Sequence, residues 1–179
     1  MENLSDNDLV RRAKRGDAAA FEQLADRHYM TVYRAAFRWC GVREDAEDIA
    51  QDVFVKVARK LGTFAGKSAF TTWLYRITVN TAMDFGRKRT TRQTHETTWT
   101  LEPGDGNPGP AGHAGIAARQ ILEAIDSLPA RQKAAALLVW AEGLTHMEAA
   151  QVLKCAEATV SAHLFQARKK LSHLLEVTP

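Results

Sequence analysis

The alternation of apolar and polar positions is most regular along residues 70–92. Mostly apolar side chains recur there at steps of three and four residues, which predicts a helix with one core-facing stripe: Phe70, Trp73, Leu74, Ile77, Thr81 and Phe85. Mostly polar or basic side chains occupy the opposite face and the end: Arg76, Asn80, Met83, Arg87, Lys88, Arg89 and Arg92. Such a face suits nucleic acid, because arginines neutralise phosphates and amides hydrogen-bond base edges. Ordinary solvation and the helix dipole explain the same pattern, so this segment alone leaves the partner open.

Three predicted helices precede this segment. Ser5 and Asp8 have the spacing of a capping box before a short helix that stops near Gly16. Asp17 can cap a second helix, which Gly41 ends. The expected buried stripe of this second helix is Phe21, Leu24, Ala25, His28, Val32, Ala35, Ala36 and Trp39. We expect the histidine in this stripe to be a core or edge residue rather than a metal ligand.

The third predicted helix spans about residues 44–61. Its expected buried stripe is Ala46, Ile49, Ala50, Val53, Phe54 and Val57. Carboxylates fill its first turns and basic residues its last, an order that complements the helix dipole: Glu44, Asp45, Glu47, Asp48 and Asp52, then Lys56, Arg59 and Lys60. Four helices with short connections predict one compact all-α domain over residues 1–92.

Residues 93–115 have no helical period and become rich in Gly and Pro, which predicts a flexible linker. A second domain then covers 116–179. Its first expected helix contains Ile121, Leu122 and Ile125 and ends at Leu128 and Pro129, and a second helix over 134–142 buries Leu137, Leu138 and Ala141. A short third helix is capped by Thr145 and Glu148. The last helix begins at about Glu157, and its expected buried stripe is Val160, Leu164, Ala167, Leu171 and Leu174.

A short helix, a tight turn and a longer amphipathic helix form the pattern of a helix-turn-helix. The exposed start of the second helix would then meet base edges, through Glu157, Thr159, Ser161, Ala162, His163 and Gln166. Arg168, Lys169 and Lys170 would reach phosphates. Pairs of helices joined by a turn are common in all-α proteins, so this pattern alone also leaves DNA binding open.

Composition and charge narrow the function classes. Residues 1–92 hold 17 Lys and Arg against 12 Asp and Glu, so the basic excess lies in the first half of the chain and favours a polyanionic partner. Charges stand where a signal peptide needs an apolar core, and no apolar run is as long as a membrane span, so we expect a cytoplasmic protein without membrane insertion. Cys40 and Cys155 form no metal or disulfide spacing, and we expect reduced thiols; a redox role stays open.

Three blocks together resemble the extracytoplasmic-function sigma factors, the smallest relatives in the bacterial sigma-70 family. The blocks are DAEDIAQDVFVKV at 45–57, FTTWLYRITVNTAMDFGRKR at 70–89, and LPARQKAAALLVWAEGLTHMEAAQVL with ATVSAHLFQARKKL at 128–171. The resemblance implies an all-α fold of two small helical domains joined by a flexible linker, with sigma region 2 at 1–92 and region 4 at 116–179. It implies no catalytic residue, metal or cofactor.

The resemblance also implies partners and roles. The RNA polymerase core would be bound through its β′ clamp and β flap, with Asp48, Gln51, Asp52 and Phe54 in the clamp-binding stretch. The loop at 63–72 and the next helix would open and read the promoter −10 element, through Lys67, Trp73, Arg76, Asn80, Arg87, Lys88 and Arg89. We expect Trp73 to be a structural brace more than a base-stacking residue. The last helix would read the −35 element, through Thr159, Ser161, His163, Gln166, Arg168 and Lys169. The linker would thread toward the RNA exit path, and an anti-sigma factor, in this family often membrane-bound, would inhibit the protein.

The chain departs from the family pattern at the turn before the last helix. Lys154 and Ala156 stand where Gly and Ser are usual, and the loss of a Ser cap weakens a helix start by about 1 kcal/mol. Ser161, Ala162, His163 and Gln166 leave the front of the last helix poor in positive charge. We therefore expect a less electrostatic −35 contact with an unusual sequence preference.

Two other functions fit parts of the pattern. The carboxylates Glu44, Glu47, Asp48 and Asp52 share one helix face, as in a helical Mg²⁺-dependent nucleotide pyrophosphohydrolase, but no second carboxylate helix is apparent. A stand-alone helix-turn-helix repressor with a helical sensing or dimerisation domain is the other alternative. Such a repressor binds its operator alone, whereas a small sigma factor binds promoter DNA well only with core polymerase.

Overall fold

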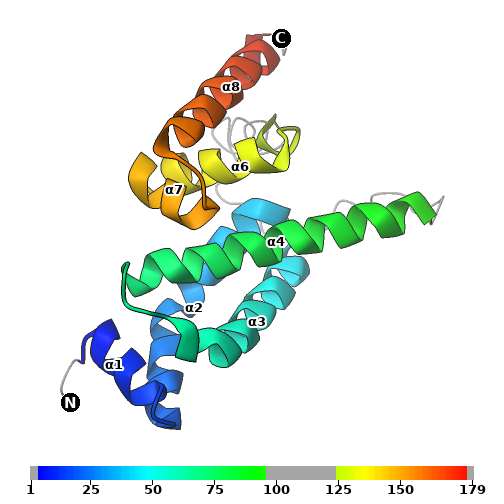
Figure 1. The fold of residues 1–179 in the computed structure, drawn as a ribbon. Helices are drawn as coiled ribbons and strands as arrows, with labels where there is room; N and C mark the ends of the chain where they lie inside the picture. The colour runs from blue at the N-terminus through cyan, green and yellow to red at the C-terminus, as the bar shows by residue number, and fades with distance from the viewer. Residues whose placement is uncertain (1–3, 96–123, 177–179) are drawn as a thin grey trace, which may run out of the picture. The chain divides into compact units, whose positions relative to one another are not determined.

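The computed structural model describes residues 4–95 and 124–176, and all regular structure within these ranges is helical (Figure 1). The described residues divide into two compact units. One holds α1, α2, α3 and α4 up to Arg89, and the other holds α6, η2, α7 and α8. The predicted all-α fold with two helical parts is confirmed. The domain limits 1–92, 93–115 and 116–179 stay predictions, because most of the linker and the start of the second domain lie outside the described residues.

The first two helices begin at the predicted caps. Ser5 Oγ accepts a hydrogen bond of 3.2 Å from the Asp8 N–H at the start of α1 (Asp6–Ala13). The Asp8 carboxylate accepts from the Ser5 hydroxyl rather than from its backbone, which differs from a full capping box. Asp17 Oδ1 accepts from the Ala20 N–H at 3.0 Å and caps α2 (Ala18–Cys40). Gly41, with a φ of 70°, follows the end of α2 in the left-handed conformation that glycine adopts without strain.

The buried stripes of α2 and of α3 (Arg43–Lys60) follow the predicted period. The buried residues of these two helices are Ala20, Leu24, His28, Val32, Ala36, Trp39, Ala46, Ile49, Ala50, Val53 and Val57. Phe21 and Phe54, both expected in the stripes, are only half-buried. The short 3-10 helix η1 (Leu61–Thr63) continues α3 and leads into the loop before α4.

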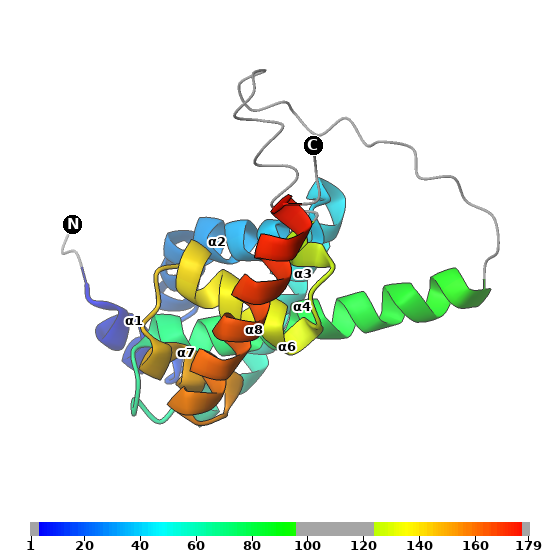
Figure 2. The same cartoon turned by 90° about the horizontal axis from the view of Figure 1, so that it is seen from above.

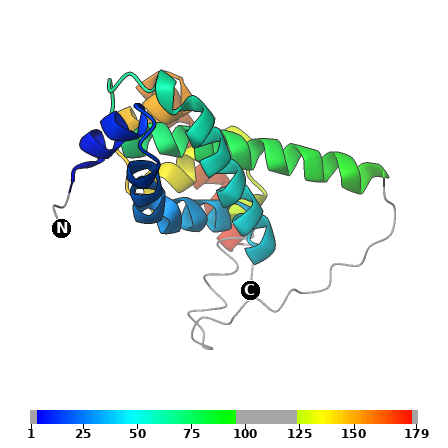
Figure 3. The ribbon, with the colours of Figure 1, turned by 90° about the horizontal axis from the view of Figure 1, so that it is seen from below.

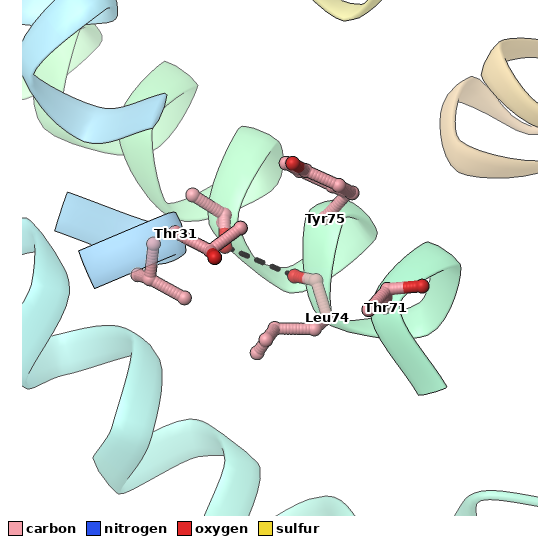
Figure 4. Close-up of a pocket in the computed structure, with 6 residues that line it drawn as sticks. Thr31, Thr71, Leu74 and Tyr75 are labelled. Carbon is pink, nitrogen blue, oxygen red and sulfur yellow. Dashed lines mark hydrogen bonds between the residues drawn. The ribbon is translucent and has the colours of Figure 1, made fainter. Parts of the chain in front are cut away.

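The long helix α4 (Phe70–His95) packs on α2 with its first half and continues beyond the bundle with its basic end (Figures 1 and 2). Phe70, Leu74, Ile77 and Thr81 are buried as predicted, whereas Trp73 and Phe85 are half-buried. A narrow apolar pocket between α2 and α4 has no room for a water molecule (Figure 4). It is lined by Thr31, Val32, Thr71, Leu74, Tyr75 and Thr78, and the Thr78 hydroxyl donates to the Leu74 carbonyl at 3.0 Å. This pocket is a packing seam rather than a ligand site.

The second unit contains α6 (Ala130–Ala136), the π-helical turn η2 (Leu137–Ala141), α7 (His146–Leu153) and α8 (Glu157–Glu176). Both hydrogen bonds of the predicted capping box are present, since Thr145 Oγ1 accepts from the Glu148 N–H and Glu148 accepts from the Thr145 N–H. The Thr145 N–H and the Thr145 hydroxyl both donate to the Glu148 carboxylate at 2.8 Å, and these two hydrogen bonds hold the pKa of Glu148 below its ordinary value. The cap therefore fixes the start of the first helix of the predicted helix-turn-helix.

The π-helical turn changes one predicted core position. The Glu142 N–H donates to the Leu137 carbonyl at 3.0 Å, a five-residue step that is wider than the α-helical one. Leu137 and Leu138 are buried as predicted, but Ala141 is exposed. The prediction for Ala141 was wrong, because the wider turn rotates this residue off the face that an unbroken α-helix would give it.

Candidate polymerase and nucleic-acid interface

An aromatic cluster holds the loop between η1 and α4 against the bundle. The ring centroids of Phe64 and Trp73 lie 5.3 Å apart, and those of Phe70 and Trp73 lie 5.7 Å apart. Phe64 and Phe70 meet edge to face, and both are buried. Trp73 is half-buried at the outer side of the cluster. This packing supports the interpretation of Trp73 as a brace, because its ring is occupied by two neighbours of the loop and helix.

The same cluster explains the buried histidine of α2. His28 is 7% exposed, and its ring centroid lies 5.3 Å from that of Phe70. Its Nε2 lies 2.8 Å from an Asp6 carboxylate oxygen, and the other oxygen of Asp6 accepts from Arg27 at 2.6 Å. The buried imidazole therefore has a hydrogen-bond partner inside the protein, as buried polar groups usually do. The prediction of a core histidine is therefore confirmed.

The loop that the cluster supports carries the first predicted −10 residue. Gly66 has a φ of 69°, which turns the backbone in a way that non-glycine residues rarely adopt. Lys67 follows it and is exposed, with Ala65 and Ala69 exposed on either side. A residue that holds this loop was not predicted from the sequence. Lys14, 50 positions earlier, donates from Nζ to the Phe64 carbonyl. No local pattern signals such a distant contact.

The remaining predicted −10 residues follow the outer side of α4. Asn80, Arg87 and Lys88 are exposed, and Arg76 is partly exposed one helical turn before Asn80. Because Arg76, Asn80 and Arg87 are four and seven residues apart, they share one side of the helix. Arg87 also forms an ion pair with Asp84. The backbone of Arg89 belongs to α4, but its side chain lies outside what the structure describes.

The predicted polymerase-binding residues divide between two sides of α3. Asp48, Gln51 and Asp52 are exposed on one face, at steps of three and four residues. Phe54 faces α2 instead, with its ring centroid 6.0 Å from that of Tyr29 and the rings nearly parallel. Val55, 49% exposed, lies one turn after Gln51 and Asp52 and completes the face of the acidic residues. This exposed β-branched residue was not singled out from the sequence, although the helical period could have indicated it.

Next to Phe54, aromatic residues line the outer side of α2. Tyr29 stacks on Tyr33 at 6.5 Å, and Tyr33 stacks on Phe37 at 6.3 Å between ring centroids. Tyr29 and Phe37 are both more than one-third exposed. Together with Phe54 they form a continuous aromatic surface on α2 and α3. The acidic face of α3 therefore borders an apolar one, which is the composition of many protein interfaces.

In the second unit, α7 and α8 pack on each other and on α6 as a helix-turn-helix (Figure 1). Val160, Leu164 and Ala167 of α8 are buried, so the predicted stripe is confirmed for these three. Lys154 closes α7 with a φ of 53° and a ψ of 51°, the left-handed conformation that glycine adopts most readily at a helix end. Arg131 donates to the Leu153 carbonyl at 3.1 Å, which satisfies one acceptor at this helix end.

The predicted −35 residues lie on two flanks of α8 rather than on one. Ser161 and Arg168 are seven residues apart and share one flank. Thr159, His163 and Gln166 lie on the other flank, since residues two apart do not face the same side. Between the flanks the surface is formed by Ala158, Ala162, Phe165 and Lys169, and Phe165 is 67% exposed. The centre of this face is therefore apolar at Ala158, Ala162 and Phe165, with the charged Lys169 one turn further along and polar groups at both edges.

One predicted −35 side chain is already bonded within the protein. Ser161 Oγ lies 3.0 Å from Nδ1 of His146 in α7 and 3.3 Å from the Glu157 carbonyl. His146 was not singled out from the sequence, although it is the first residue of α7 after the Thr145 cap. The pair links the two helices of the helix-turn-helix at their exposed ends.

Comparisons with known proteins decide the family. The family model for Sigma-70 region 2 matches residues 24–92, and that for Sigma-70, region 4 matches residues 118–171. The RNA polymerase sigma-H factor of Pseudomonas aeruginosa is 33% identical over 182 residues, which cover 96% of this chain and 94% of that protein. This chain belongs to the extracytoplasmic-function (ECF) sigma factors of the sigma-70 family. An ECF RNA polymerase sigma-E factor of Escherichia coli K12 is 32% identical over 185 residues, covering 98% and 96% of the two chains.

Two solved structures are similar to this sigma factor. CnrH in complex with the cytosolic domain of CnrY has a TM-score of 0.72 and 26% identity, over 97% of this chain and 99% of that one. The sigma factor RpoE of Bartonella quintana, in complex with the anti-sigma factor NepR, has a TM-score of 0.71 and 26% identity, over 89% and 98%. Both relatives were therefore solved with a protein partner named in the complex.

The family membership settles the general function. The protein is an RNA polymerase sigma factor that binds promoter elements for transcription initiation, and it is not an enzyme. The pyrophosphohydrolase and repressor alternatives are set aside on this ground. In residues 4–95 and 124–176, no group of three or more His, Cys, Asp or Glu side chains is arranged to hold a metal ion. None of the helices in these ranges is both long enough and apolar enough to span a bilayer.

Proposed function

We propose that the first unit of this sigma factor docks on the clamp coiled coil of the polymerase β′ subunit through α3. The exposed face of Asp48, Gln51 and Asp52 supplies the polar contacts, and Val55 adds an apolar one. Phe54 supports this face indirectly, because its ring stacks on Tyr29 of α2 and so helps to position α3. Charge pairs at the rim of such an interface set orientation and association rate, while the apolar residues between them contribute contact area.

Promoter opening and −10 recognition belong to the loop at 64–69 and to α4. Opening requires a base to leave the stack, which costs a few kcal/mol, and a rigid loop pocket offsets that cost. Lys67 in the loop and Arg76, Asn80, Arg87, Lys88 and Arg89 along α4 contact the DNA, with Trp73 bracing the loop. Asn80 can hydrogen-bond a base edge, and the basic residues contact phosphates.

The helix-turn-helix of the second unit reads the −35 element and meets the β flap. Thr159, Ser161, His163 and Gln166 contact bases or position those contacts, and Arg168 and Lys169 contact phosphates. The apolar centre at Phe165, between these flanks, suits thymine methyl groups or deoxyribose more than phosphate. Residues 93–115 connect the two units along the path toward the RNA exit.

The observation that carries this proposal is the set of exposed polar residues on α3 and α4, in the unit that matches sigma-70 region 2, and on α8, in the unit that matches region 4. The proposal for regulation is based on the two solved complexes, CnrH with CnrY and RpoE with the anti-sigma factor NepR. We propose an anti-sigma factor for this protein too, membrane-bound in the manner frequent in the family, which acts on a sigma factor in the cytoplasm.

Run-off transcription tests the proposal. Purified protein is added to bacterial core RNA polymerase with a fragment library of genomic DNA, and start sites are mapped. We expect specific transcripts only when both components are present, and aligned start sites should give a −10 and a −35 motif. Transcripts that align on a −10 motif alone would contradict the assignment of α8, and no specific transcript would contradict the proposal as a whole.

A further inference from the structure

A single lysine of the N-terminal segment reaches the loop that precedes α4. Lys14 stands at the end of α1, and its Nζ donates a hydrogen bond to the Phe64 carbonyl. The same Nζ lies 5.9 Å from the centroid of the Phe64 ring, within the range of a cation–π interaction. Figure 3 shows α1 at the same end of the bundle as this loop. Both contacts of the ammonium group therefore fix one residue, the first of the loop.

The helix α1, at whose end Lys14 stands, is fixed to the bundle by packing and by hydrogen bonds. Leu9 and Val10 of α1 are buried, and α1 packs on α2. Asp6 bonds both Arg27 and His28 of α2, and His28 packs on Phe70 at the far end of the loop. The loop is thus held at Phe64 by Lys14 and at Phe70 by the aromatic cluster. Between these two points its residues are mostly exposed and include the left-handed Gly66.

We infer that α1 is a support for the promoter-opening loop and that Lys14 is a positioning residue for −10 recognition. This inference rests on the function proposed for the loop at 64–69. A loop that receives an extruded base loses conformational entropy when it becomes ordered. A loop that is already fixed in the binding conformation loses less entropy when the base binds. Neither α1 nor Lys14 lies within residues 24–92, where the region 2 family model matches. The support is added by residues before that match.

The contact should act on opening and not on docking. Lys14 contacts the loop, whereas the exposed faces of α3 and α8 belong to other helices. Its loss should therefore leave polymerase affinity and the first, closed promoter complex unchanged. The step that slows is the one in which the −10 strand separates and a base enters the loop.

The experiment uses the holoenzyme on a promoter that carries 2-aminopurine in the −10 element. Stopped-flow fluorescence separates the affinity of the closed complex from the rate constant of opening. Lys14→Met removes the ammonium but keeps the length of the side chain. Lys14→Arg keeps a cation within reach of Phe64. Arg15→Met is the matched control, since the exposed side chain of Arg15, next to Lys14, donates only to the Arg11 carbonyl of α1 among the hydrogen bonds described.

We expect Lys14→Met to lower the opening rate constant about five- to tenfold with unchanged closed-complex affinity, the scale set by one hydrogen bond and one cation–π contact. Lys14→Arg should recover most of the rate, and Arg15→Met should match the wild type. If the wild-type holoenzyme opens the promoter and the Lys14→Met holoenzyme opens it with an equal rate constant, this inference alone would be overturned. A variant that loses polymerase affinity, closed-complex affinity and thermal stability together, without recovery by Lys14→Arg, would also overturn it. Failure of the wild-type holoenzyme to open any promoter would overturn the proposed function first.

Discussion

The imidazole Nδ1 of His146 lies 3.0 Å from the hydroxyl oxygen of Ser161, so the first helix of the helix-turn-helix holds a side chain of the second. Ser161 was predicted to contact DNA. Its hydroxyl donates its proton to the Glu157 carbonyl and still has an open lone pair for a donor group of a base. The bond to His146 restricts the rotation of that hydroxyl. A residue without direct base contact can therefore influence which base is accepted.

His146→Ala and Ser161→Ala should change the preference for the same base pair of the −35 element, by about three- to tenfold in relative promoter strength. Their double variant should show no further change, because both remove one hydrogen-bonded unit. His163→Ala, on the opposite flank of α8, should affect a different base pair. Transcription from promoters with a randomised −35 element measures all four variants. A change for Ser161→Ala with none for His146→Ala would contradict the coupling.

The acidic face of α3 offers a test with an internal control. Asp48→Asn combined with Asp52→Asn removes two exposed carboxylates four residues apart, and should weaken the affinity for core polymerase roughly 10- to 100-fold. Glu22→Gln combined with Asp26→Asn makes the same charge change at the same spacing on exposed positions of α2. Fluorescence anisotropy of labelled protein titrated with core polymerase compares the two pairs. Equal losses for both pairs would show a net-charge effect and contradict the docking assignment.

Lys154 is a conformational weak point of the helix-turn-helix. Its φ of 53° places a side chain in the left-handed region, which costs about 1 kcal/mol relative to glycine. Lys154→Gly should therefore raise the free energy of unfolding of the second unit by about that amount. Lys170→Gly, the same substitution inside α8, should lower it by about 1 kcal/mol. Urea titration followed by circular dichroism measures the change in the free energy of unfolding for both variants. A decrease for Lys154→Gly would contradict the proposal that Lys154 is strained.

The cap of α7 predicts a pH dependence of stability. Hydrogen bonds from Thr145 hold the folded pKa of Glu148 below its ordinary value of 4.5, so the carboxylate form stabilises the fold. This contribution is complete above pH 4.5 and is lost as the pH falls through the lower, folded pKa. The melting temperature of Glu148→Gln should lie below that of the wild type at neutral pH, and the difference should shrink below pH 4.5. A difference that stays constant from pH 7 to pH 3 would contradict the linkage.

Local signals in the sequence predicted most of the helical architecture. Caps at Ser5, Asp17 and Thr145 lie where the spacing placed them, because capping depends on residues three positions apart. Apolar periodicity likewise predicted the buried stripes of α2 and α3. These features depend on neighbours within one or two helical turns, so one sequence is enough to find them.

Features that depend on distant contacts or on irregular backbone were not predicted. The contact of Lys14 with Phe64 joins residues 50 positions apart. The π-helical turn places Ala141 outside the core, and no residue type in the segment Leu137–Ala141 predicts a π-helical turn. Phe54 was expected in the buried stripe of α3, but it is only half-buried and stacks on the partly exposed ring of Tyr29. The surroundings of Phe54 therefore depend on how α2 packs against α3, which the sequence does not give.

The dependence of promoter binding on core polymerase tests the central claim most directly. A labelled promoter fragment from the run-off experiment is titrated with this protein alone, with core polymerase alone and with both together, at one salt concentration. We predict sequence-specific binding only for the mixture, at least tenfold tighter than to a fragment with scrambled −10 and −35 elements. Equally tight and specific binding by the protein alone would contradict the account, because a protein of that behaviour selects its DNA site without the polymerase.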